Sequence, residues 1–108
     1  MSNSARVADT RKVYRLGADL AGTRLRILTL RSLARQVWRE LARVDPAPAV
    51  VSWPGSASWY DPAKHRIELA RNHQTRVMLL HELTHALGHD DHGRRFQSCF
   101  ADLLARYL

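Results

Sequence analysis

Three parts of the chain have features of helices, and in the first and third of them hydrophobic residues recur at helical spacing. The first part predicts a helix over Leu30–Val44, which Pro46 would stop. The second part is apolar and follows the N-cap residues of Asn72–Thr75, so it predicts a helix over Arg76–Leu87 that ends at Gly88, because glycine suits the left-handed residue that follows a helix. The third predicts a helix after His89–His92 that runs through the last residues. Its apolar positions are Phe96, Cys99, Phe100, Leu103, Leu104 and Tyr107.

Between the first and second helical parts, the pattern is that of short strands. Val50–Trp53 is β-branched and aromatic, and Pro54–Gly55 is a turn signal. Ser56–Tyr60 and His65–Ala70 follow as two extended segments joined by a four-residue turn. Before the first helical part, Thr23–Thr29 alternates in a way that suits either a half-buried strand or an extended lead-in. This order predicts an α+β fold, in which an N-terminal helix, the helix over Arg76–Leu87 and a C-terminal helix pack on a small antiparallel β-meander.

Composition narrows the class of protein. The chain of 108 residues is 45% hydrophobic and 25% charged, which predicts a single globular domain over residues 1–108, with Met1–Ala5 disordered. No apolar segment approaches the roughly 18 residues that a bilayer requires, and Met1–Arg15 has no signal-peptide core. Cys99 is the only cysteine, which excludes an internal disulfide and a multi-cysteine zinc cage. We therefore expect a cytoplasmic protein.

The second predicted helix carries the sequence His81-Glu82-Leu83-Thr84-His85, an H-E-x-x-H motif. Residues four apart lie on one helix face, so the two imidazoles can bind the same cation. Zinc favours nitrogen ligands, and a catalytic site keeps one position for water, which Glu82 can deprotonate. The motif lies within an apolar helix, where charged side chains without partners are costly. We expect a zinc site.

Three residues after the motif are candidates for the third metal ligand. His89 would lie about 12 Å along an unbroken helix from His81, too far to share an ion. Asp91 falls on the last position of the extended metzincin pattern H-E-x-x-H-x-x-G-x-x-H, but metzincins carry a methionine turn downstream that this chain lacks. His92 is the third candidate, so spacing alone leaves Asp91 and His92 open.

His92 begins the segment His92-Gly93-Arg94-Arg95-Phe96. Together with the H-E-x-x-H motif, this segment resembles the SprT-like metallopeptidases and their compact bacterial relatives, over about Ile67–Leu108. The resemblance implies a zincin-like fold with Zn²⁺ held by His81, His85 and His92, and Glu82 as the general base for hydrolysis of a polypeptide. It also implies that the strand over His65–Ala70 is a sheet edge on which the substrate lies extended.

Other polar and aromatic residues are expected to be structural. Cys99 and three tryptophans, Trp38, Trp53 and Trp59, are predicted to lie in the core. His65 is expected beside a surface turn and His73 in a loop, neither as a ligand. For stabilising a developing oxyanion, Tyr60, Tyr107 or an arginine are candidates among which the sequence does not select.

The net charge of +7 lies entirely within residues 1–43, which hold ten basic and three acidic residues; residues 44–108 hold seven of each. Arg31, Arg35, Arg39 and Arg43 follow at intervals of four, so the predicted first helix would carry four positive charges on one face. Such a stripe can bind nucleic acid, or can simply be a solvated face.

Four functions are therefore compatible with the sequence. The first is a zinc metallopeptidase. The second is an inactive or regulatory zincin fold that binds nucleic acid through the arginines. The third is a repressor-cleaving protease of the ImmA/IrrE type, and the fourth is a zinc hydrolase of a non-peptide amide. The role of Glu82 distinguishes the metallopeptidase from the inactive or regulatory fold, because a structural zinc site does not need a general base.

Overall fold

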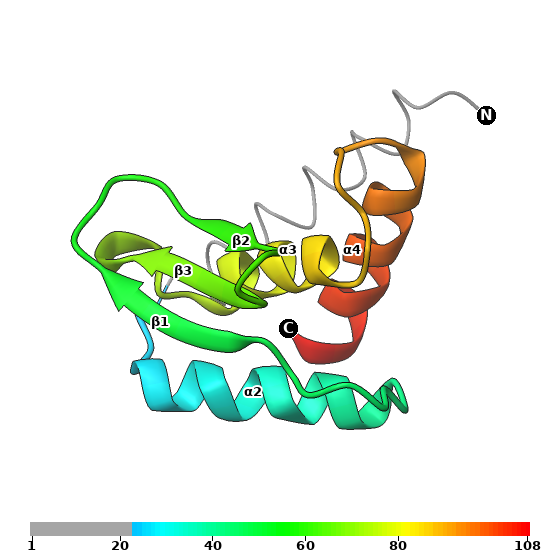
Figure 1. Cartoon of the computed structure of the whole chain (residues 1–108), viewed down its shortest axis with the longest axis horizontal. Coiled ribbons are helices and arrows are strands. Elements are labelled where there is room, and N and C mark those ends of the chain that lie inside the picture. The colour runs from blue at the N-terminus through cyan, green and yellow to red at the C-terminus, as the bar shows by residue number, and fades with distance from the viewer. Residues whose placement is uncertain (1–22) are drawn as a thin grey trace.

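The computed structural model describes residues 23–108, which form an α+β domain as predicted. Met1–Ala5, expected to be disordered, lie outside the described residues. Three helices, a three-stranded sheet and one short 3₁₀ turn follow in the order α2 (Ile27–Glu40), β1 (Ala49–Trp53), β2 (Trp59–Asp61), β3 (Arg66–Ala70), η1 (Arg71–His73), α3 (Arg76–Ala86) and α4 (Arg94–Tyr107). Helix α2 packs against β1, and α3 contacts both β2 and β3 (Figure 1). Helix α4 packs on α3, which places α3 at the centre of the domain.

The sheet is mixed, so the predicted antiparallel meander is wrong. Its strand order is β1-β3-β2, with β1 parallel and β2 antiparallel to β3. The C-terminal end of β1 and the start of β2 lie at the same end of the sheet, because Trp53 is level with Ala70 and Trp59 with Glu68 of β3. The loop between β1 and β2 therefore crosses the end of β3 and makes it the central strand.

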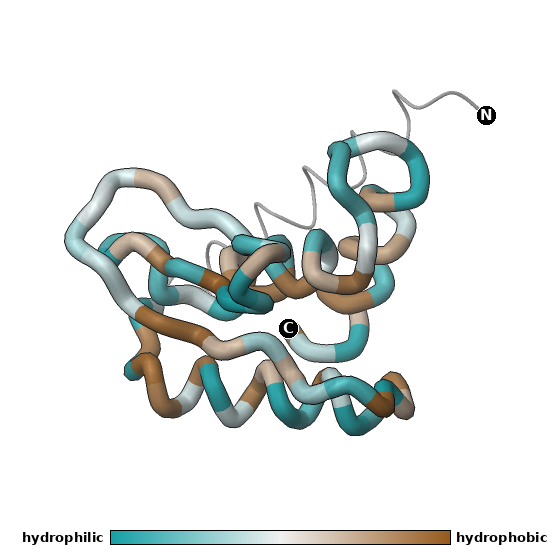
Figure 2. The backbone as a smooth tube through the Cα atoms, in the orientation of Figure 1, coloured by the Kyte–Doolittle hydropathy of each residue, from teal (hydrophilic) through white to brown (hydrophobic). Residues whose placement is uncertain are grey.

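Burial along β3 shows which face of the sheet lies on the core. Ile67 and Leu69 are fully buried and alternate with half-buried Arg66 and Glu68, so the sheet has one apolar face. That face and the buried side chains of all three helices form one core. Figure 2 shows the hydropathy of the residues along the backbone of these elements. The core members that are essentially inaccessible to water include Leu30, Val37, Val50, Ile67, Leu69, Leu79, Leu80, Leu83, Phe96 and Phe100.

Of the two alternatives for Thr23–Thr29, the structure has the extended lead-in, which enters α2 at Ile27. Leu25 donates its backbone N–H to the Gln74 carbonyl (2.7 Å), and the helix begins two residues later at Ile27. The Gln74 side chain is buried, donates to the Leu25 carbonyl and accepts from Ser52 Oγ. This single amide ties the entry to α2, the end of β1 and the approach to α3 together, which a periodicity argument cannot detect.

Helix α2 ends four residues before the predicted end. Arg43 donates its backbone N–H to the Trp38 carbonyl, and Ala42 donates to the Arg39 carbonyl, which is the Schellman arrangement. Ala42 occupies the left-handed region with φ 54°, where glycine is usual. Val44, which matched the apolar period, is fully exposed. Arg43 consequently lies beyond the helix, so the predicted stripe of four arginines on one helix face is reduced to three.

No helix in residues 23–108 combines the length and the apolar character that crossing a membrane requires.

Replacing Ala42 with glycine should raise the free energy of unfolding by about 0.5–1 kcal/mol, because glycine adopts a left-handed conformation without a Cβ clash. The matched change Ala101→Gly, in the interior of α4, should lower it by about as much. Urea unfolding of both variants checks this. Equal destabilisation by both changes would contradict the Schellman ending of α2.

Candidate metal centre

Three imidazole rings converge at one end of α3. His81 and His85 come from successive turns of α3, and His92 comes from the loop before α4. The His92 Nε2 atom lies 3.2 Å from His81 Nε2 and 3.1 Å from His85 Nε2. Nitrogen ligands of a tetrahedral zinc ion lie about 3.3 Å apart, given the usual zinc–nitrogen distance. The donor set and its spacing therefore fit a Zn²⁺ ion.

A second group of contacts fixes the orientation of these rings. His85 Nδ1 lies 2.6 Å from the His89 carbonyl oxygen, so this nitrogen donates its proton there and leaves Nε2 as the unprotonated, ligating atom. The chain can turn back in this way because Gly88 has φ 104° and ends α3, as the sequence predicted. His89 thus contributes to the site through its backbone rather than its side chain.

Phe96 packs against all three histidines. Its ring centroid lies 5.0, 4.7 and 4.7 Å from those of His81, His85 and His92, and the Phe96 side chain is 1% exposed. Phe100 lies behind it, 5.3 Å from the His81 ring. The sequence identified Phe96 as a core position and as part of the His-Gly-x-x-Phe segment. The structure adds that the Phe96 ring is the apolar surface against which the three imidazole rings pack.

Asp91 and His92, both left open as the third ligand by spacing, have different surroundings. The Asp91 carboxylate accepts the backbone N–H of Gly93 at 2.9 Å, which shapes the turn before α4. Among residues 23–108, the group of side chains able to share one ion consists of His81, His85 and His92. Asp91 therefore positions the loop, and His92 reaches the other two imidazoles.

Glu82 lies beside the histidines and is 3% exposed. Its side chain lines the same cavity, of about 340 Å³, which is bounded by the three histidines and by Trp59 and Tyr60 of β2. Burial raises the pKa of the Glu82 carboxyl to about 7, although a hydrogen bond with the Tyr60 backbone opposes this. A carboxyl group with this pKa can exchange a proton near neutral pH.

Two of the three imidazoles are shifted towards the neutral form. Burial, together with the neighbouring His85 and His92, lowers the pKa of His81 to about 4. Burial and His85 also lower the pKa of His92. Neutral imidazole is the form that binds a metal ion, so both shifts favour binding of a cation.

Hydrogen bonds show the partners of several other residues singled out in the sequence. Tyr60 Oη lies 2.7 Å from His65 Nδ1, and Tyr107 Oη donates to Glu40 at 2.7 Å, so both hydroxyls have partners outside the three imidazoles. His65 lies in the turn before β3, as expected, and is half-buried, with its Nε2 atom 2.7 Å from the Pro46 carbonyl oxygen. His73 contacts Ser58 Oγ.

The predicted core residues outside the site divide into buried and exposed side chains. Trp38 is buried, whereas Trp59 is 40% exposed, so its prediction as a core residue is wrong. Trp59 instead lies against the Trp53 ring, with centroids 4.8 Å apart, and donates to Glu68. Cys99 is half-buried and packs against the core.

The raised pKa of Glu82 predicts how the metal-free protein responds to pH. The folded state holds this proton more tightly than the unfolded state, so the stabilising contribution is complete below pH 4.5 and is lost as pH rises through about 7. Glutamine does not titrate, so the Glu82→Gln variant does not lose this contribution as the pH rises. The free energy of unfolding of the variant minus that of the wild type should therefore be about 2–3 kcal/mol larger at pH 8 than at pH 5.

Urea unfolding in EDTA at the two pH values measures this change, because the difference between pH values cancels the constant cost of burying an amide. Glu40→Gln is the control, since hydrogen bonds from Tyr107 and Gln36 lower the pKa of that exposed carboxyl. A relative stability of Glu82→Gln that does not change with pH would show that the carboxyl is ionised in the fold.

Comparisons of the chain with protein-family models, with curated proteins and with solved structures gave no match. The resemblance to SprT-like metallopeptidases therefore stays a prediction from the His81–His85 and His92–Phe96 segments. What the structure contributes independently of any relative is a cluster of three imidazoles with a buried carboxyl group in the same cavity.

Proposed function

We propose that this protein is a zinc-dependent peptidase in which His81, His85 and His92 hold Zn²⁺ and Glu82 is the general base. The observation that carries the proposal is that His92 Nε2 lies 3.2 Å from His81 Nε2 and 3.1 Å from His85 Nε2, beside Glu82, which is 3% exposed. Structural zinc sites are usually closed by four protein ligands, whereas three protein ligands leave a position for water or substrate.

Zinc, when bound, would lower the pKa of a coordinated water and polarise the substrate carbonyl. Glu82 would take the proton of the attacking water at its carboxylate and deliver that proton to the leaving amine nitrogen. A base with a pKa near the working pH suits both transfers. The Phe96 ring excludes water from the inner side of the imidazoles, which strengthens the electrostatic interactions in the cavity.

Within residues 23–108, β2 pairs only with β3, and its other edge supports a polypeptide as the substrate. The resemblance implied that the strand over His65–Ala70 is this edge, but β3 is paired on both sides, so the edge beside the histidines is β2. Trp59 and Tyr60 of β2 line the same cavity as His81, Glu82, His85 and His92. An extended peptide that pairs with β2 through main-chain hydrogen bonds would pass beside the metal ligands. A non-peptide amide would not need this edge.

Nucleic-acid binding stays a separate prediction. Arg35 and Arg39 are exposed on α2, but Arg31 donates its Nε–H to the Val50 carbonyl at 2.7 Å, and Arg43 pairs with Asp45 at 3.1 Å beyond the helix. These contacts occupy two of the four arginines that the sequence placed on one face. The geometry of the histidine cluster therefore supports the peptidase proposal better than a binding function through α2.

Purified protein should bind one Zn²⁺ per chain, measured by metal analysis after dialysis and by competition with a chelator. His92→Ala should weaken zinc binding at least about 100-fold, because it removes a ligand, whereas Asp91→Ala should weaken it by about 10-fold or less. Loss of zinc in Asp91→Ala with retention in His92→Ala would overturn the ligand assignment.

Glu82→Gln should keep zinc affinity within a few-fold of the wild type and lower the rate of peptide hydrolysis at least about 100-fold, as expected for loss of a general base. Cleavage of an unfolded polypeptide such as casein, followed by mass spectrometry of the fragments, measures the rate. Glu40→Gln, which removes a distant carboxylate on α2, is the matched control and should retain full activity. Hydrolysis by zinc-loaded Glu82→Gln at the wild-type rate would contradict the assigned base.

A further inference from the structure

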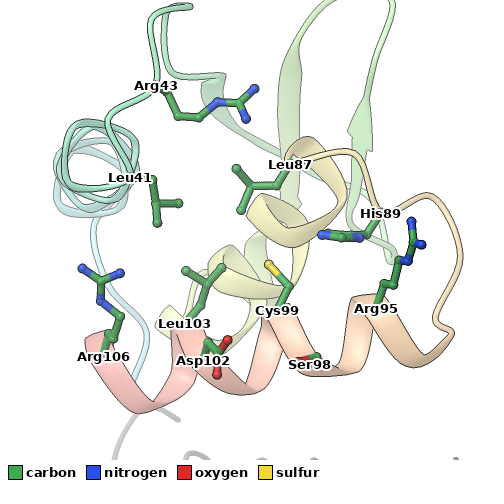
Figure 3. Close-up of a pocket in the computed structure, with 10 residues that line it drawn as sticks. All are labelled: Leu41, Arg43, Leu87, His89, Arg95, Ser98, Cys99, Asp102, Leu103 and Arg106. Atoms are coloured by element: carbon green, nitrogen blue, oxygen red, sulfur yellow. The ribbon is translucent and has the colours of Figure 1, made fainter.

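A second and larger cavity lies apart from the histidine cluster. Its volume is about 570 Å³, and it is an open cavity lined by residues that follow α2 and α3 and by one side of α4 (Figure 3). None of the three converging histidines or Glu82 lines it. A volume of this size is in the range of small-molecule sites in proteins.

The inner surface of this cavity is aliphatic. Leu41, Leu87 and Leu103 point into the same gap from three different elements, and the Cys99 side chain lies beside them (Figure 3). These side chains offer contact to an apolar group but no aromatic ring on which a nucleobase could stack. The occupant that fits this floor therefore has a flexible aliphatic part.

The rim of the cavity is positively charged. Arg43, Arg95 and Arg106 surround the aliphatic floor, against one carboxylate, Asp102 (Figure 3). Arg43 forms an ion pair with Asp45, and Arg106 lies over the Tyr107 ring near Glu40. Arg95 forms no ion pair with any residue from 23 to 108. An anionic group on the occupant would find its partner here.

One residue, His89, connects this cavity to the histidine cluster. The His89 side chain lines the cavity, while its backbone carbonyl accepts the proton of His85 Nδ1 at 2.6 Å. A displacement of His89 by an occupant would change the hydrogen bond that orients a metal ligand. Such outer contacts alter metal affinity by about 10- to 100-fold when they are lost.

We propose that this cavity binds a small carboxylate with an aliphatic chain, and that its occupation changes the affinity of the histidine cluster for zinc through His89. The aliphatic floor selects the chain and the arginine rim selects the carboxylate. The binding step is independent of the proposed peptidase function; the effect on zinc rests on that function.

Thermal unfolding of the metal-free protein tests the binding step. Octanoate, at a concentration about tenfold above its dissociation constant, should raise the Tm by about 5 °C. Acetate lacks the chain, octylamine has the opposite charge and 1-octanol has no charge, so none of the three should raise the Tm by more than about 1 °C at the same concentration. Equal shifts with octanoate and 1-octanol would overturn the role of the arginines, and no shift with octanoate would overturn the site.

The double variant Arg95→Gln, Arg106→Gln should lose most of the octanoate shift. The matched double variant Arg71→Gln, Arg76→Gln removes the same charge from exposed positions outside the cavity and should keep the shift. If both double variants lose the shift to the same extent, binding reflects net charge alone and the cavity is not the site.

Competition with a chelator tests the effect on zinc. Octanoate should change the zinc dissociation constant at least about threefold in the wild type and not in Arg95→Gln, Arg106→Gln, whereas acetate should leave both unchanged. A protein that shows the octanoate shift but binds no zinc would disprove the peptidase proposal and leave the carboxylate site standing. A protein whose zinc affinity is the same with and without octanoate would disprove the link through His89.

Discussion

The convergence of three imidazole nitrogens is the constraint on which the rest of the site depends. His92 Nε2 lies within hydrogen-bonding distance of the Nε2 atoms of both His81 and His85. One proton joins two such nitrogens, whereas a bound cation would attract the lone pairs of all three. The fold holds this arrangement by packing Phe96 beneath the rings and by turning the chain at Gly88 so that the His89 carbonyl orients His85. A bound metal ion would therefore stabilise the folded chain as well as supply chemistry.

The buried carboxyl group of Glu82 follows from the same arrangement. Helix α3 is the central element of the domain, so most of its side chains are buried, and Glu82 shares that burial with Leu79, Leu80 and Leu83. A small domain has little stability to spare for a buried ionisable group. The proton on Glu82 and the neutral state of His81 are two consequences of one apolar environment. In functional sites, such shifted pKa values commonly accompany proton transfer.

Local signals in the sequence predicted the helices and the histidine cluster better than the sheet. The helical period predicted the apolar faces of α2 and α4, and Gly88 marked the end of α3 correctly. Strand order depends on contacts between distant segments, so alternation in β3 could not tell a central strand from an edge strand. The Schellman ending at Ala42 broke the apolar period before Val44, and the role of the His89 carbonyl depends on the backbone, which no side-chain pattern encodes.

X-ray absorption spectroscopy at the zinc edge of the zinc-loaded protein identifies the atoms that bind the metal. If the three imidazoles hold Zn²⁺, the spectrum should show a four-coordinate ion with three imidazole nitrogens at about 2.0–2.1 Å and one further light ligand from solvent. The imidazole scattering should fall by one ring in His81→Ala if the protein still retains the metal. An ion surrounded only by oxygen atoms, or one with a sulfur ligand from Cys99, would contradict the assignment of the three histidines as ligands.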